Sequence, residues 1–115
     1  MSHPILHITT LPEWQAAKTA GQYSTPSLKS QGFIHCSLAH QLERVANKFY
    51  AGHSDLVILV IDPHRLTSEL KMEEAVDVDD DFPHIYGPLN LDAVVDVVDL
   101  QVSPDGLFHL PQGLK

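Results

Sequence analysis

Three histidines lie in apolar, strand-like segments of the sequence: His7, His35 and His84. His35 belongs to residues 32–37 (GFIHCS), where His35 and Ser37 are two positions apart and therefore project from the same face of a strand. Imidazole and hydroxyl groups on one face of a strand end are typical of a ligand-binding cleft. The alternative is structural: a buried histidine satisfied by the backbone, and Ser37 serving as the N-cap of the helix that follows.

A second dense motif is residues 82–90 (FPHIYGPLN). Its two prolines and its glycine restrict the backbone, so we expect His84 and Tyr86 to be held rigidly on one face. If this motif meets GFIHCS in space, their polar side chains form one cleft suited to a small-molecule or nucleotide ligand. The remaining five histidines are expected to face solvent: His3, His40, His53, His64 and His109.

Two other chemistries compete for the same residues. Three histidines with an open fourth position could hold catalytic zinc, which would make the chain a metal-dependent hydrolase. The sequence lacks a local ligand spacing such as His-Glu-x-x-His, so no metal is assigned. A Cys36 nucleophile would need His7 or His84 as its base, because the adjacent His35 points to the opposite strand face. Glycine-rich phosphate-binding loops are also absent from the sequence.

Length and charge limit the function classes. The 115 residues suit a single domain over positions 1–115, and the formal net charge of −8 argues against a nucleic-acid partner. The acidic run over residues 69–81 is expected to be a solvated loop, because it lacks the spacing of a calcium-binding loop. The lone cysteine, the missing secretory signal and the missing apolar run of about 20 residues predict a cytoplasmic protein outside the membrane.

Two helices are indicated. Thr10, followed three residues later by a glutamate, has the spacing of a capping box, which predicts a helix over residues 11–20. Residues 38–51 place their apolar side chains on one stripe, which predicts a second helix with Arg44 and Lys48 largely on its other side.

The strands do not alternate with helices throughout, which favours the α+β class. Residues 56–61 form a continuous apolar run, typical of a central strand that is covered on both faces. Residues 23–31 are rich in serine, threonine and proline and are expected to be a loop. The expected strands are residues 4–8, 33–36, 56–61, 93–102 and 107–110. Residues 66–74 are a further candidate strand, followed by the acidic loop.

The order of these motifs, from the histidine of the first strand through GFIHCS to FPHIYGPLN, resembles the domain-of-unknown-function family 952 over about residues 5–110. The activity of that family is not established. The family in turn is similar to the ADP-ribosyltransferase fold, and most closely to the RNA 2′-phosphotransferases, which also have a strand ending His-x-His-x-Ser. This resemblance implies two small, antiparallel-rich sheets around a cleft, with two main helices.

The resemblance also implies NAD as the cofactor and gives the cleft residues roles. His7 matches the polar residue that holds the NAD ribose, whereas His35 and Ser37 match the motif that lines the nicotinamide pocket. Tyr86 would stack on the ligand, and Asn90, at the end of the second motif, joins the binding residues.

The implied reaction is NAD-dependent transfer of an ADP-ribosyl or related glycosyl group, with His35 or His84 orienting the acceptor. Glu73 is the candidate for the catalytic carboxylate. The RNA 2′-phosphotransferases bind phosphate with several arginines, but this chain has only Arg44 and Arg65. That departure keeps open a non-catalytic module that binds a nucleotide-like ligand on the same fold.

Overall fold

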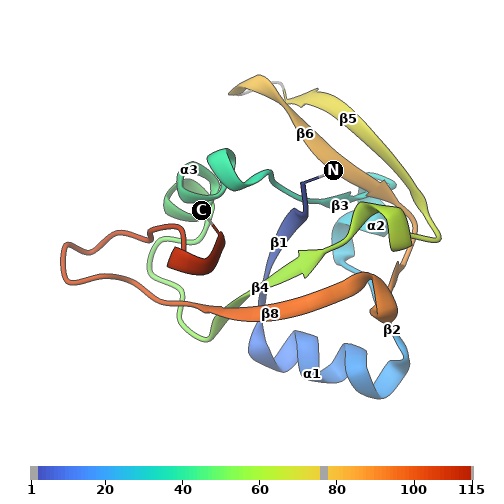
Figure 1. The fold of residues 1–115 in the computed structure, drawn as a ribbon, viewed down its shortest axis with the longest axis horizontal. Coiled ribbons are helices and arrows are strands. Elements are labelled where there is room, and N and C mark those ends of the chain that lie inside the picture. Colours follow the sequence, from blue (N-terminus) through green and yellow to red (C-terminus); the bar gives the residue numbers. More distant parts are fainter. Residues whose placement is uncertain (1–2, 76–77, 115) are drawn as a thin grey trace.

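Within residues 3–75 and 78–114, which the computed structural model describes, the strands form three small antiparallel sheets (Figure 1). Their strand orders are β1-β4-β8, β2-β7 and β3-β6-β5. Three α-helices accompany these sheets in the described residues, two of them long and one short. The α+β class is therefore confirmed, with one more small sheet and one more short helix than the sequence predicts.

The elements follow one another along the chain as strands, helices and three short 3₁₀ turns. In order they are β1 (Ile5–Thr10), α1 (Leu11–Ala20), β2 (Gln22–Tyr23), α2 (Pro26–Ser30), β3 (Ile34–His35), α3 (Ala39–Phe49), β4 (Leu56–Ile61), a turn at Pro63–Arg65, β5 (Glu69–Ala75), β6 (Val78–Tyr86), β7 (Leu89–Asn90), a turn at Leu91–Ala93, β8 (Val94–Leu100) and a turn at Gln112–Leu114.

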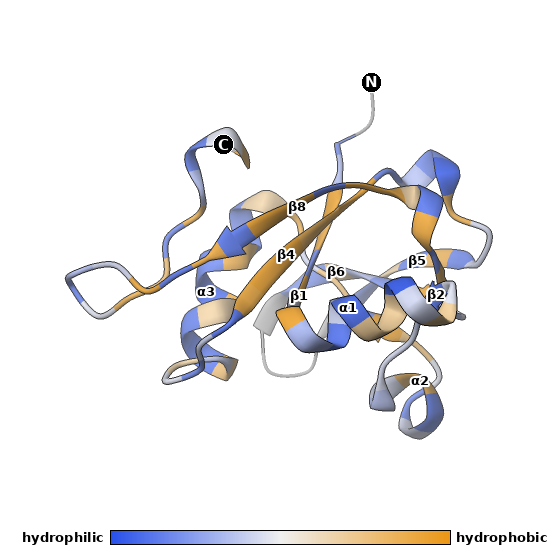
Figure 2. Cartoon of the chain, turned by 90° about the horizontal axis from the view of Figure 1, so that it is seen from below, coloured by the Kyte–Doolittle hydropathy of each residue, from blue (hydrophilic) through white to orange (hydrophobic). Residues whose placement is uncertain are grey.

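Strand β4 is the centre of the molecule, because every one of its residues is buried. Its alternate side chains enter two different core clusters: Val57 and Leu59 pack into one, Ile58 and Val60 into the other. Figure 2 shows β4 as a continuously apolar ribbon, and its neighbours in the sheet are β1 and β8. The prediction of a central strand that is covered on both faces is confirmed.

Helix α1 has the predicted caps. The Thr10 hydroxyl accepts the N–H of Glu13, and Gly21 ends the helix in the left-handed region with φ of 88°. Trp14 and Ala17 are buried against the core cluster of Val57 and Leu59.

Helix α3 begins one residue later than predicted, because Leu38 and not Ser37 is its N-cap. The backbone N–H and C=O of Ser37 pair with Leu6 of β1 at 2.7 and 2.8 Å, which holds Ser37 in an extended conformation. The Gln41 side chain instead accepts the Leu38 N–H at 2.9 Å. The prediction of a Ser37 N-cap is therefore wrong.

Three further segments differ from prediction. A short helix, α2, occupies part of the expected loop at 23–31. Most of the acidic run at 69–81 is strand, because β5 covers Glu69–Ala75 and β6 begins at Val78. Residues 76–77 of that run lie outside the described residues. The expected strand at 107–110 is reduced to one bridge between Val102 and Phe108. Among the described residues, no helix combines the length and apolarity needed to cross a membrane.

Candidate functional site

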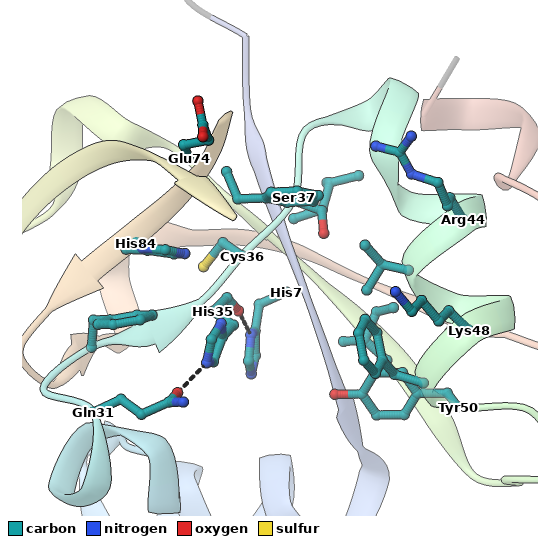
Figure 3. A pocket seen from close by; sticks show the side chains of 16 residues that line it. His7, Gln31, His35, Cys36, Ser37, Arg44, Lys48, Tyr50, Glu74 and His84 are labelled. Atoms are coloured by element: carbon teal, nitrogen blue, oxygen red, sulfur yellow. Dashed lines mark hydrogen bonds between the residues drawn. The ribbon is translucent and has the colours of Figure 1, made fainter. Parts of the chain in front are cut away.

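A cleft of about 630 Å³ opens between the β3-β6-β5 sheet, strand β1 and helix α3 (Figure 3). This volume lies within the range of small-molecule binding sites in proteins. His35 and His84 lie on the sheet side of the cleft, whereas Arg44, Lys48 and Tyr50 lie on the α3 side.

The sheet side of the cleft follows from strand alternation. Ile34 of β3 pairs with Ile85 of β6, and both side chains are buried in the core. The next pair in register, His35 and His84, must therefore point to the opposite face of the sheet. Their ring centroids are 5.4 Å apart, so the structure brings the GFIHCS and FPHIYGPLN motifs together.

His84 is held on two sides. Its Nδ1 lies 2.8 Å from Oε1 of Glu73 on β5, and its ring stacks on Phe33 with centroids 4.0 Å apart. A carboxylate only accepts hydrogen bonds, so Nδ1 carries the proton and Nε2 of the neutral ring keeps a lone pair. His84 lines the cleft, and Nε2 has no hydrogen-bond partner among the described residues.

Glu73 is fixed by a second donor, the hydroxyl of Tyr86, which shares Oε1 with His84. The Tyr86 hydrogen bond, followed by that of His84, lowers the pKa of the Glu73 carboxyl below its ordinary value. Glu73 is therefore ionised at neutral pH. Tyr86 does not line the cleft, and its ring lies beneath the ammonium of Lys71 at 4.8 Å. Among the described contacts, Tyr86 therefore acts on the Glu73 carboxylate and is not itself part of the cleft lining.

His7 borders the cleft but has both ring nitrogens occupied. Its Nδ1–H donates to the backbone carbonyl of His35 at 2.6 Å, and its Nε2 lies 2.8 Å from the hydroxyl of Tyr23. Burial lowers the pKa of His7 to about 4, so the ring is neutral at pH 7. The Tyr23 hydroxyl that lies against Nε2 also bonds to the hydroxyl of Thr9 at 3.0 Å. In this arrangement His7 supports the backbone of β3 and has no free ring nitrogen for a ligand.

His35 is more exposed than His7 and His84. Its Nε2 bonds to the side-chain oxygen of Gln31, as Figure 3 shows. Partial burial, together with the neighbouring His84, lowers the pKa of His35, which favours the neutral ring at pH 7. The bond to Gln31 Oε1 places the proton of that neutral ring on Nε2 and leaves Nδ1 with a lone pair.

Of the two other predicted binding residues, Ser37 lines the cleft and Asn90 lies outside it. Ser37 is largely buried, lines the cleft, and has no side-chain hydrogen bond to another described residue. Asn90 does not line the cleft: its Oδ1 accepts the N–H of Thr67 at 3.0 Å, and its Nδ2 donates to the carbonyl of Arg65 at 2.8 Å. Asn90 therefore holds a turn outside the cleft.

Three residues of α3 and its C-cap were missed as site residues: Arg44, Lys48 and Tyr50. The spacing of four residues between Arg44 and Lys48 places both side chains on one helix face. Val45 and Phe49 of the predicted apolar stripe also line the cleft, so the wall that α3 provides includes the edge of that stripe as well as its polar neighbours. Arg44 also reaches Asp80 of β6, with 3.6 Å between Nη2 and Oδ2.

The metal and thiol alternatives lack support from the described side chains. Across residues 3–75 and 78–114, no three histidine, cysteine, aspartate or glutamate side chains gather as a metal-ligand set. Cys36 is buried, and burial raises the pKa of its thiol far above the ordinary value, so the thiolate is disfavoured. All five histidines expected to face solvent are exposed, as predicted.

Fold and site together define a small α+β protein with a histidine-lined cleft. The chain belongs to the family described as "Protein of unknown function (DUF952)", whose sequence profile matches residues 8–97. It is similar to the crystal structure of protein CC0527 from Caulobacter crescentus, with 33% identity, a TM-score of 0.86, and coverage of 96% of this chain and 97% of that one. The solution structure of CC0527 has a TM-score of 0.79 at 33% identity, with 90% of each chain covered. No curated protein matches the chain.

Proposed function

We propose that this protein is a transferase that binds NAD in the cleft and moves its ADP-ribosyl group, or a related glycosyl group, to a small acceptor. One observation carries the proposal: His84 borders the cleft with its Nδ1–H held by the Glu73 carboxylate. An imidazole oriented in this way by a carboxylate is the usual arrangement of a general base.

The residues of the sheet side would divide the reaction between them. Nε2 of His84 takes the proton of the acceptor hydroxyl, the acceptor oxygen bonds to the ribosyl carbon, and the bond from that carbon to nicotinamide breaks. With water as acceptor, the products are ADP-ribose, nicotinamide and a proton. His35 and Ser37 are placed to orient the reactants, because both line the same cleft.

The proposal extends to the fold. Small antiparallel sheets around a cleft are the architecture expected of an ADP-ribosyltransferase-like domain, distantly similar to RNA 2′-phosphotransferases. The cleft volume of about 630 Å³ suits a ligand of nucleotide size. His7 would act on the ligand only through the β3 backbone, since both of its ring nitrogens are already bonded.

A second candidate is a non-catalytic module that binds a nucleotide-like ligand in the same cleft. The observation that favours it is the position of the carboxylates. Glu73 is engaged by His84 and Tyr86, and Glu74 is the one carboxylate among the described residues that lines the cleft. Positive charge that develops on the ribosyl carbon would then have little stabilisation nearby.

The experiment that separates the two is nicotinamide release from NAD, measured for wild type, His84→Gln, Glu73→Gln and the exposed control His64→Gln. The transferase predicts release that falls by about 10²-fold or more in His84→Gln and is unchanged in the control. Thermal stabilisation by NAD without release in wild type would establish the binding module and refute the transferase. Equal release by wild type and His84→Gln would refute the role of His84.

A further inference from the structure

The two basic residues of the cleft lining lie together on its α3 side, in a chain that is acidic as a whole. Seven basic and fifteen acidic residues give the whole sequence a formal charge of −8. Among the described residues that line the cleft, two are basic, Arg44 and Lys48, and one is acidic, Glu74. Asp80 pairs with Arg44 and offsets part of its charge, so Lys48 provides most of the local attraction for an anion.

Arg44 is a half-exposed side chain that pairs with Asp80 on β6. Its Nη2 lies 3.6 Å from Oδ2 of Asp80, and the same carboxylate oxygen accepts the amide of buried Gln41 at 2.9 Å. The Gln41 amide also donates to the backbone carbonyl of Asp81, which ties α3 to β6. A guanidinium has five N–H donors, so one contact to Asp80 leaves the others for a ligand in the cleft.

Lys48 stands one helical turn further along the same face of α3. Its ammonium lies 5.3 Å from the centroid of the Phe49 ring, and it forms no salt bridge with another described residue. Arg44 and Lys48 together form a pair of cations on the cleft wall that faces His35 and His84 (Figure 3).

The two sides of the cleft therefore have different chemistry. The sheet side offers stacked aromatic rings, with Phe33 against His84, which suits a planar ring. The α3 side offers two cations and the Tyr50 hydroxyl, which suit the oxygens of a phosphate group.

We infer that Arg44 and Lys48 bind the phosphate groups of a ligand whose ring lies against the sheet side of the cleft. This inference rests on the proposed function for the position of the ring, and it names the ligand class as a phosphate-bearing nucleoside derivative. Arg44 provides directed N–H donors and Lys48 a mobile point charge.

The test is calorimetric titration of ADP-ribose and of adenosine, which has no phosphate, into three proteins at low and high salt. These are wild type, Arg44→Gln/Lys48→Gln, and the matched control Lys18→Gln/Lys29→Gln. The control changes the net charge equally through two exposed lysines outside the cleft. We expect ADP-ribose to bind the cleft variant about tenfold or more weakly, with loss of the salt dependence, while adenosine binding is unchanged.

A charge-preserving variant, Arg44→Lys/Lys48→Arg, should retain most of the affinity for ADP-ribose and so exclude a folding defect as the cause. Equal affinity of ADP-ribose for wild type and the glutamine variant would overturn the inference. The inference would also be overturned if the wild-type protein bound ADP-ribose no more tightly than adenosine.

The two proposals can fail separately. Nicotinamide release with an unchanged KM in Arg44→Gln/Lys48→Gln would overturn the phosphate site and leave the transferase standing. Binding of ADP-ribose through Arg44 and Lys48, without any nicotinamide release, would support the phosphate site and overturn the transferase.

Discussion

The buried His7 should make the protein acid-sensitive. Burial lowers the pKa of His7 from 6.5 to about 4 in the folded protein, whereas in the unfolded chain the ring has its ordinary pKa. Between these values the unfolded chain binds more protons than the folded protein, so the free energy of unfolding falls as pH falls. The His7 contribution is complete above about pH 6.5 and is lost as pH falls towards 4.

The size of the effect follows from these two pKa values. At pH 5, about 1.5 pH units below the unfolded value, the loss attributable to His7 is about 2 kcal/mol, since each unit is worth about 1.4 kcal/mol. The perturbation is His7→Gln, whose neutral amide can still donate and accept a hydrogen bond but does not titrate. The assay is urea denaturation of wild type and His7→Gln at pH 8 and pH 5.

We expect wild type to lose about 2 kcal/mol more than His7→Gln between the two pH values, whatever the stability of the variant at pH 8. The control is His64→Gln, which removes an exposed imidazole and should follow wild type. Both proteins keep His35, so the change in unfolding free energy that comes from His35 is the same in both and cancels in the comparison. Parallel losses in wild type and His7→Gln would refute the argument, because they would mean that His7 is not kept neutral by the fold.

Three further predictions concern stability and reactivity. Gln41→Ala leaves the Leu38 N–H and the Asp81 carbonyl without their buried partner, so urea denaturation should show a loss of about 2 kcal/mol; a loss below about 0.5 kcal/mol would contradict this. Asn47→Ala removes both bonds to the backbone of Phe108, so limited proteolysis should cleave the C-terminal segment faster than in wild type, and equal rates would refute that anchor. Cys36 should resist a thiol reagent in the folded protein and react once urea unfolds it; rapid reaction in buffer would show that the thiol is not buried.

Elements with a strong local signal were predictable from the sequence. The N-cap at Thr10 and the stop at Gly21 position α1 within its own residues, and both are seen in the structure. The reciprocal half of the predicted capping box is absent, because the Glu13 carboxylate accepts from the Thr10 hydroxyl and not from its backbone N–H. The unbroken apolar run of β4 requires cover on two faces, which only a central strand provides. In each case the information lies in a few adjacent residues, so no distant contact is needed to interpret it.

Residues governed by distant partners were not predictable in this way. Ser37 has the composition of an N-cap, but its backbone pairs with Leu6, 31 positions earlier in the sequence, and that pairing decides its conformation. The same limit applies to Arg44 and Lys48. Helical periodicity shows that they face away from the core stripe, but only the position of the β3-β6-β5 sheet makes that face part of a cleft wall.

The candidate site depends on the register of the β3-β6-β5 sheet. Glu73 lies opposite Phe82 and Lys71 opposite His84, so these side chains share one face and the Glu73 carboxylate can reach His84 diagonally. A shift of one residue in β6 would turn His84 into the core and bring Ile85 to the cleft. The buried pair Ile34–Ile85 opposes that shift, because exchanging Ile85 for a histidine would place an imidazole in the apolar cluster. The apolar side of this sheet thus sets the geometry of its polar side, which explains how the hydrogen-bonded pair of His84 and Glu73 is held in place.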